Sequence, residues 1–147
     1  MKITWEQYFI EVAKLVAKKS SCVKRQIGAL LVKDGMLVST GYNGTPRNTK
    51  NCNEGGCARC NNANIKSGEN LHECICVHAE ENSIVQAAYQ GISTKGSTMY
   101  TSFCPCLYCA KSIINAGIKE VYYNQSYAMD EATIKLFNEA QVKIEKY

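Results

Sequence analysis

The sequence contains few prolines and no long apolar run. Only two prolines occur among 147 residues, although 46% of the residues are hydrophobic. No apolar stretch approaches the roughly 18 residues that a bilayer-spanning helix needs. The amphipathic segment Trp5–Val16 contains Glu6, Glu11 and Lys14 and therefore differs from a secretory signal peptide. These absences argue against a membrane protein, and we expect no membrane partner and a cytoplasmic, soluble protein.

Internal repeats, low-complexity tracts and breaks in composition are also missing, although the chain is long enough to bury a sizeable core. The net charge is only +4, and Lys2, Lys143 and Lys146 lie near the termini rather than in a basic run. Proteins that follow a nucleic-acid backbone need such a run. We therefore expect one domain spanning residues 1–147 and no nucleic-acid polymer as a partner.

Cysteine, in contrast, is abundant, with nine residues. Many cysteines in a secreted chain would indicate disulfides. An odd number that includes a Cys-x-x-Cys pair instead indicates reduced thiols that bind metal. We therefore expect zinc ligation in a reducing compartment.

The motif that carries chemistry is His78-Ala79-Glu80, followed later by Pro105-Cys106-Leu107-Tyr108-Cys109. One imidazole and two thiolates supply three ligands to Zn²⁺, which leaves the fourth position to a water. Bound zinc lowers the pKa of that water from about 15.7 to about 7, and Glu80 can move its proton. The Cys-x-x-Cys pair alone fits a redox pair or half of a structural site. Its combination with His-x-Glu favours a catalytic site with ligands His78, Cys106 and Cys109.

Hydrophobic periodicity predicts alternating helices and strands. Lys33-Asp34-Gly35 is a hairpin signal, and the two halves of the motif fall at helix starts, with Pro105 in the first turn of the second. Helix N-termini favour thiolates, so both motif cysteines are expected to ionise readily. The pattern predicts an α/β fold whose sheet of about five strands has helices on both faces. The expected helices cover residues 4–19, 77–89, 105–117 and 130–140, and the expected strands cover residues 27–32, 36–42, 98–101, 120–123 and 142–145.

The stretch Thr45–Glu73 is too long for a simple connector, and such loops are usually functional or held by something other than a core. Cys57-x-x-Cys60 has the spacing of a structural zinc site, whereas the alternative is a group of buried small side chains. Seven candidates come close to supplying two closed sites of four ligands each. Cys104 is a further thiol to which we assign no ligand role. The candidate structural ligands are Cys22, Cys52, Cys57, Cys60, His72, Cys74 and Cys76.

The order H-x-E, then P-C-x-x-C, resembles the signature of the zinc-dependent cytidine and deoxycytidylate deaminase superfamily. Further segments, spread over nearly the whole chain, resemble its deoxycytidylate (dCMP) deaminase branch. The resemblance implies a three-layer α/β/α fold with a mixed sheet, in which two adjacent helix N-termini hold the metal. The segments that carry it are Ser21–Ala29, Gly41–Arg47, Gly55–Asn61, His78–Asn82 and Gln125–Asp130.

The resemblance implies hydrolytic deamination of dCMP to dUMP and ammonia, which supplies dTMP synthesis. Glu80 would take a proton from the zinc-activated water, deliver it to N3 of cytosine and pass a second proton to the leaving amino group. Related enzymes carry a structural zinc, for which Cys22 and Cys52 are the safer ligands by resemblance. They are usually homohexamers.

Substrate contacts are also implied by the resemblance. Asn43 would bind the sugar hydroxyl, although a turn role competes with this. The N–H of Ala79 and the carbonyl near Thr101 would contact the cytosine. The candidates for the 5′-phosphate are Lys24, Arg25, Asn82 and Tyr127.

A glycine-rich stretch resembles the regulatory motif of dCMP deaminases, which binds dCTP with Mg²⁺ as activator and dTTP as inhibitor. Glycines allow the backbone to approach phosphates closely, and a nearby arginine adds charge. A plain turn is the alternative interpretation. The residues of this predicted allosteric site are Gly41, Tyr42, Asn43, Gly44 and Arg47.

Other functions compete with this one. Deoxycytidine or dCTP could be substrates as well, and a polynucleotide cytosine or adenine deaminase shares the motif. A non-catalytic zinc-knuckle module built on Cys52–Cys76 is the alternative from another class. Glu80 favours an enzyme, because a closed structural zinc site needs no carboxylate beside an open coordination position.

Overall fold

The structure, a computed structural model, describes residues 1–127 and 131–147. One mixed sheet with the strand order β2-β1-β3-β4-β5 forms its centre. Strand β1 is antiparallel to β2 and β3, whereas β3, β4 and β5 run parallel. The predicted mixed sheet of about five strands is confirmed. The strands are β1 (Gly28–Lys33), β2 (Met36–Tyr42), β3 (Thr98–Phe103), β4 (Glu120–Gln125) and β5 (Lys143–Lys146).

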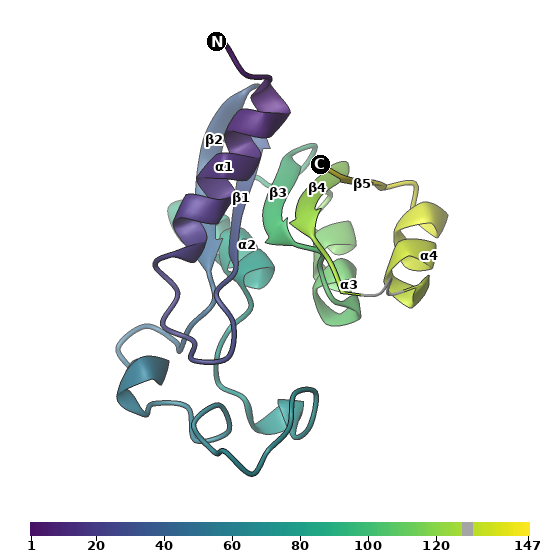
Figure 1. The fold of residues 1–147 in the computed structure, drawn as a ribbon. Coiled ribbons are helices and arrows are strands. Elements are labelled where there is room, and N and C mark those ends of the chain that lie inside the picture. Colours follow the sequence, from purple (N-terminus) through teal and green to yellow (C-terminus); the bar gives the residue numbers. More distant parts are fainter. Residues whose placement is uncertain (128–130) are drawn as a thin grey trace.

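Helices cover both faces of this sheet, as Figure 1 shows. Helix α1 (Trp5–Ala17) packs on one face, where Phe9 contacts Leu30 and Tyr100 in one apolar cluster. Helices α2 (Ala79–Gln90), α3 (Leu107–Asn115) and α4 (Glu131–Glu139) lie on the other face. Successive residues of a strand point to opposite faces. Leu31, next to Leu30, accordingly joins the second cluster with Met99. The three-layer α/β/α fold is confirmed.

The hairpin between β1 and β2 has the predicted turn. Lys33 pairs with Met36, so Asp34 and Gly35 form a two-residue loop. Both have positive φ, 52° and 75°. Left-handed values at both positions are typical of the type I′ turn, which Asp-Gly favours.

Close packing of α2 against β2 depends on Gly41. A Cβ added there would meet the carbonyl oxygen of Ala79 and the amide nitrogen of Ser83, both backbone atoms of α2. Ser39, two residues earlier on β2, also donates its hydroxyl to the Ser83 carbonyl at 2.8 Å. Gly41 therefore places the first turn of α2 directly on the sheet.

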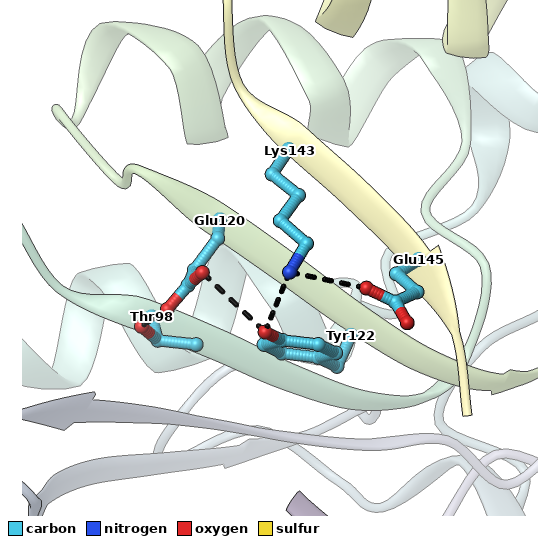
Figure 2. Close-up of polar contacts among 5 residues, drawn as sticks. All are labelled: Thr98, Glu120, Tyr122, Lys143 and Glu145. Atoms are coloured by element: carbon cyan, nitrogen blue, oxygen red, sulfur yellow. Dashed lines mark hydrogen bonds and ion pairs between the residues drawn. The ribbon is translucent and has the colours of Figure 1, made fainter.

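Polar side chains link β3, β4 and the edge strand β5, as Figure 2 shows. Thr98 Oγ1 donates to Glu120 Oε1 at 2.7 Å, and Tyr122 Oη donates to Glu120 Oε2 at 3.4 Å. Lys143 Nζ donates to Tyr122 Oη at 3.2 Å and lies 3.1 Å from Glu145 Oε2. Charged side chains on an edge strand discourage pairing with another chain. The network thus protects the β5 edge.

The helix starts differ slightly from the predicted ones. Helix α2 begins at Ala79 with His78 as N-cap, and α3 begins at Leu107 with Cys106 as N-cap. Pro105 precedes this N-cap, so its predicted place in the first turn is wrong. N-cap residues keep an extended backbone, here with ψ of 149° and 167°, which directs both side chains across the helix ends.

Helix α4 begins at Glu131, so the predicted start at Asp130 lies outside the described residues, as does the rest of 128–130. Within the two described ranges, none of the helices has the length and apolar character needed to cross a membrane.

The long segment predicted between Thr45 and Glu73 projects from one end of the sheet (Figure 1). It contains two short 3₁₀ turns, Cys52–Glu54 and Leu71–Glu73. Gly44 and Val77 close its base through paired backbone hydrogen bonds of 3.2 and 2.8 Å. Arg59 is buried and donates to the carbonyls of Glu69 and Lys66. Backbone and side-chain hydrogen bonds, rather than helices or strands, organise this segment.

Candidate metal and active site

The starts of α2 and α3 bring His78, Cys106 and Cys109 together. His78 Nδ1 lies 3.5 Å from Cys106 Sγ and 3.3 Å from Cys109 Sγ, and the three ligand atoms lie within 4.8 Å of one another. Zinc bonds of about 2.3 Å to sulfur and about 2.0–2.1 Å to nitrogen fit such a spacing around one ion. The donor set is one that zinc accepts in catalytic sites, with one position left open.

Glu80 lies beside this group in the first turn of α2. Its side chain is buried, with 3% of the residue exposed, and Thr101 Oγ1 donates to Glu80 Oε1 at 3.2 Å. Burial raises the pKa of the Glu80 carboxyl above its ordinary value. A raised carboxyl pKa brings proton uptake closer to neutral pH, which suits general acid–base catalysis.

The two motif thiols differ in acidity. The hydrogen bond from Cys109, together with His78, lowers the pKa of Cys106 to about 4 despite its burial. The same hydrogen bond to Cys106, with burial, raises the pKa of Cys109. Without a bound metal, Cys106 is therefore the more acidic of the two thiols. A divalent cation bound to both sulfurs would favour both thiolates, because metal binding releases protons from its ligands.

A pocket of about 210 Å³ opens onto His78 and Glu80. Arg25 lies in its wall, with its guanidinium carbon 4.6 Å from the ring centroid of Phe103 and 4.1 Å from that of Tyr127. The two rings are 4.9 Å apart at an interplanar angle of 67°. The aromatic pair fixes a cationic group in the same pocket as the buried carboxyl.

Of the other predicted phosphate contacts, Tyr127 lines the pocket, whereas Lys24 and Asn82 are not among its lining residues. Lys24 is exposed. Asn82 Nδ2 donates to the carbonyl of Tyr42 at 2.9 Å. The structure thus brings Arg25 and Tyr127, but not Lys24 or Asn82, to the pocket.

Asn43 is buried and connects two backbone segments. Its Oδ1 accepts from the N–H of Ile27 at 2.8 Å, and its Nδ2 donates to the carbonyl of Arg25 at 2.7 Å. Each end of a side-chain amide can make a second hydrogen bond. Asn43 therefore supports the loop that carries Arg25 and keeps capacity for a further contact.

Two of the remaining residues of the predicted regulatory motif, Gly41 and Arg47, approach α2. Tyr42 is exposed, and Gly44 belongs to the backbone bridge that closes the long segment. The Arg47 guanidinium lies 4.3 Å from the Tyr89 ring centroid and donates to Gln86 at 3.4 Å. These contacts give the motif a role in packing in addition to the predicted regulatory one.

Sequence reasoning gave no role in the site to several residues that line the pocket, among them Phe103, Tyr123 and Ser126. Phe103 ends β3, Ser126 follows β4, and Tyr123 lies in the carboxyl half of β4, which runs parallel to β3. Ligands of open α/β sheets bind at the carboxyl ends of the strands. The direction in which β3 and β4 run, rather than a sequence motif, is the signal that could have identified these residues.

A second group of potential metal ligands lies in the long segment, just after it, and in the connection between α1 and β1. Two sets of four cysteines have sulfurs within 4.8 Å of one another. His72 is absent from both sets; its side chain is 80% exposed and lies 3.8 Å from the Glu73 carboxylate. The two sets are Cys22, Cys52, Cys60 and Cys76, and Cys57, Cys60, Cys74 and Cys76.

The thiols of this group also differ in acidity. Burial alone would raise the pKa of Cys57, but backbone N–H groups of Cys60 and Ile75 outweigh it and lower that pKa to about 7. Burial and neighbouring thiolates raise the pKa of Cys60 and of Cys76. Mutual repulsion keeps the whole set from ionising without a cation.

Comparisons with known proteins agree with this geometry. Residues 3–125 match the model of the cytidine and deoxycytidylate deaminase zinc-binding region. The chain is 46% identical over 144 residues to deoxycytidylate deaminase of Schizosaccharomyces pombe, covering 98% of this chain and 44% of that protein. It is 36% identical over 154 residues to human deoxycytidylate deaminase, covering 99% of this chain and 80% of that protein.

The chain spans about half the length of the two yeast deoxycytidylate deaminases that it matches, 44% and 46%. Among solved structures, dCMP deaminase from the cyanophage S-TIM5, in complex with dCMP and dUMP, superimposes with a TM-score of 0.82 at 29% sequence identity. The match covers 100% of this chain and 99% of that chain. The family-model match, the fold and the similarity to these relatives show that the present chain belongs to the cytidine and deoxycytidylate deaminase family.

Proposed function

We propose that this chain hydrolyses the 4-amino group of dCMP to give dUMP and ammonia. One observation supports this most strongly. The pocket that opens onto His78 and Glu80 also holds Arg25, so a nucleotide base and its phosphate have partners in one cavity. The relatives named deoxycytidylate deaminase, and the cyanophage enzyme seen with dCMP and dUMP, support the choice of substrate.

His78, Cys106 and Cys109 would hold the catalytic zinc, since their donor atoms fit one ion and leave one position open. Zinc bound there would lower the pKa of a water molecule to about 7. Residues 1–147 would act as one catalytic domain, because a single sheet carries both halves of the site.

Glu80 would move the protons. Its carboxylate would accept a proton from the attacking water and deliver it to N3 of the cytosine, and it would then protonate the departing amino group. Thr101 holds the carboxyl in place through the 3.2 Å hydrogen bond. The backbone of Ala79 and the Thr101 region would orient the base, and Asn43 would use its remaining hydrogen-bonding capacity on the sugar.

Arg25 would bind the 5′-phosphate, with Tyr127 beside it. A guanidinium can donate two parallel hydrogen bonds to a phosphate. Phe103 and Tyr127 hold the guanidinium against the pocket wall, so little side-chain freedom is lost on binding. This contact would favour dCMP over deoxycytidine.

Regulation and assembly belong to the same proposal. The segment Gly41–Gly44, with Arg47, would bind dCTP with Mg²⁺ as activator and dTTP as inhibitor, as its resemblance implies.

Exposed apolar side chains on α2 and α3 support a homo-oligomer, with a hexamer as the expected form. These side chains are Val85, Tyr89, Leu107 and Tyr108.

Ammonia release from dCMP, deoxycytidine and dCTP by the zinc-loaded protein tests the proposal. We expect dCMP to give the highest kcat/KM, with dCTP raising and dTTP lowering the rate. Equal turnover of deoxycytidine and dCMP would contradict the phosphate contact.

A further inference from the structure

The six cysteines of the long segment and its flank form two overlapping sets of four. Cys60 and Cys76 belong to both sets, whereas Cys22 and Cys52 occur in one and Cys57 and Cys74 in the other. The six side chains pack as a single cluster. Five of them, all except the half-buried Cys74, are buried. The two sets of four sulfurs therefore have two sulfurs in common.

The separations between the sulfurs suit direct coordination to single ions. Cys57 Sγ lies 3.9 Å from Cys74 Sγ, and Cys60 Sγ lies 3.6 Å from Cys74 Sγ. Zinc–sulfur bonds of about 2.3 Å in a tetrahedron place neighbouring sulfurs roughly 3.8 Å apart. The observed spacings match that edge.

One zinc ion cannot use all six thiols. A structural zinc site is closed by four ligands. A single ion bound by the first set would leave Cys57 and Cys74 unligated, and one bound by the second set would leave Cys22 and Cys52. Cys52 and Cys57 are both fully buried. Only two ions give every thiol of the cluster a metal partner.

We propose that the six cysteines bind two zinc ions, with Cys60 and Cys76 as bridging ligands. Cys22 and Cys52 complete the first ion, and Cys57 and Cys74 complete the second. Each ion then has four sulfur ligands, and the two ions lie closer than about 4.6 Å, twice the zinc–sulfur bond length.

The surroundings of the cluster suit its charge. Six thiolates around two zinc ions keep a net charge of about −2, which hydrogen-bond donors must stabilise. Asn61 Nδ2 lies 3.9 Å from Cys52 Sγ and also donates to the carbonyls of Cys52 and Cys57. Arg59, which lies between Cys57 and Cys60 in the sequence, is buried, and its guanidinium donates to the carbonyl of Glu69 in the adjoining loop. Asn61 thus places a polar donor beside one sulfur of the cluster.

The segment needs such a cluster to hold its shape. The larger apolar side chains Leu71 and Ile75 are 60% and 45% exposed, so they supply little buried surface. The cysteines are instead the buried apolar cluster of this region. Metal binding can supply the folding free energy that a small apolar core cannot.

Cadmium-113 NMR of the full chain loaded with that metal tests the proposal without any substitution. We expect two resonances typical of four-sulfur coordination, coupled to each other through the bridging sulfurs, and a third from the site with His78. A single four-sulfur resonance, or two without metal–metal coupling, would overturn the bridged arrangement.

Zinc content per chain gives a second test. The unaltered protein should contain about three zinc ions, one at His78 and two in the cluster. The double variant Cys57→Ser/Cys74→Ser should lose one, as should Cys22→Ser/Cys52→Ser. His72→Ala, a substitution at the exposed histidine, is the matched control and should lose none. Two ions in the unaltered protein, with none lost in Cys57→Ser/Cys74→Ser, would contradict the proposal. Neither measurement depends on dCMP turnover, so this inference and the proposed reaction can fail separately.

Discussion

At the scale of single residues, Glu80 is the group on which the proposed proton transfer depends most. Its carboxyl is buried, its pKa is raised by that burial, and it receives a hydrogen bond from Thr101. These features suit a group that accepts and returns protons. Glu80 is not needed as a metal ligand, because His78, Cys106 and Cys109 already supply three donor atoms to the proposed zinc site.

Replacing Glu80 with glutamine should lower kcat by at least about 100-fold, since general acid–base catalysis contributes about 10²–10⁴. Zinc content should stay the same, because the three ligands are untouched. Steady-state kinetics with metal analysis checks both results. Glu81→Gln, one residue further along α2, is the control and should keep near-normal turnover. Normal activity of Glu80→Gln would rule out the proposed proton transfer.

Replacing Arg25 with alanine should lower kcat/KM for dCMP by about 10- to 100-fold, the value of a lost charged hydrogen bond. Turnover of deoxycytidine should change little, because it has no phosphate. The substitution Arg25→Lys should restore part of the loss. Lys24→Ala, at the exposed neighbour, should behave like the unaltered protein. An equal loss for both substrates would show that Arg25 acts on folding or chemistry instead.

Residue-scale features were predictable to different degrees. His78, Glu80, Cys106 and Cys109 form a local motif whose spacing determines its chemistry, so the sequence alone was sufficient. The partners of Asn43 were not predictable, because they are backbone groups of Ile27 and Arg25 that the fold brings near. The unequal acidity of Cys106 and Cys109 arises from their mutual contact and burial, which spacing does not show.

At the scale of elements, the contact between β2 and α2 places the catalytic helix. Gly41 permits this contact, since a Cβ there would meet the backbone of α2 at Ala79 and Ser83. The same glycine belongs to the predicted regulatory motif. Packing and regulation therefore make different predictions for one substitution.

Gly41→Ala should reduce the free energy of unfolding by about 1–3 kcal/mol, the usual cost of overpacking. Activity without any effector should fall as well, because the shift acts on the helix that carries His78 and Glu80. Denaturant unfolding and basal kinetics measure these effects. Thr40→Ala, at the exposed neighbouring position, should alter neither. Full stability with loss of the effector response alone would contradict a packing role.

Elements were predicted well where the signal was local. Asp34-Gly35 determines its own turn, and the runs of β-forming residues on either side of it located β1 and β2. The start of α3 was misplaced because Pro105 suits the first turn of a helix in general, whereas here Cys106 takes the N-cap position. Phe103 and Tyr123 were missed because they come together only where parallel strands end side by side.

At the scale of the whole molecule, two regions differ in what stabilises them. The sheet is held by apolar clusters on both faces. The segment between Gly44 and Val77 is held by hydrogen bonds and a thiol cluster. The cysteine-rich composition predicted that metal replaces a core there, but only the fold shows that Cys60 and Cys76 belong to both groups of four sulfurs.

Removal of zinc by a chelator should therefore destabilise the cysteine-rich segment more than the sheet. We expect amide hydrogen exchange in residues 45–76 to accelerate when zinc is removed, because the cluster supplies the stability of this segment. Amides of β1 and β3, which lie between the apolar clusters, should keep their protection. Equal exchange with and without zinc in residues 45–76 would show that the segment does not depend on metal.

The most direct test of the proposed reaction is the stoichiometry of product formation from dCMP by the zinc-loaded chain. We predict that each dCMP consumed yields one dUMP and one ammonia. We also predict that the enzyme turns over dCMP faster than deoxycytidine at equal substrate concentration. Failure of the zinc-loaded protein to release ammonia from dCMP would contradict the account.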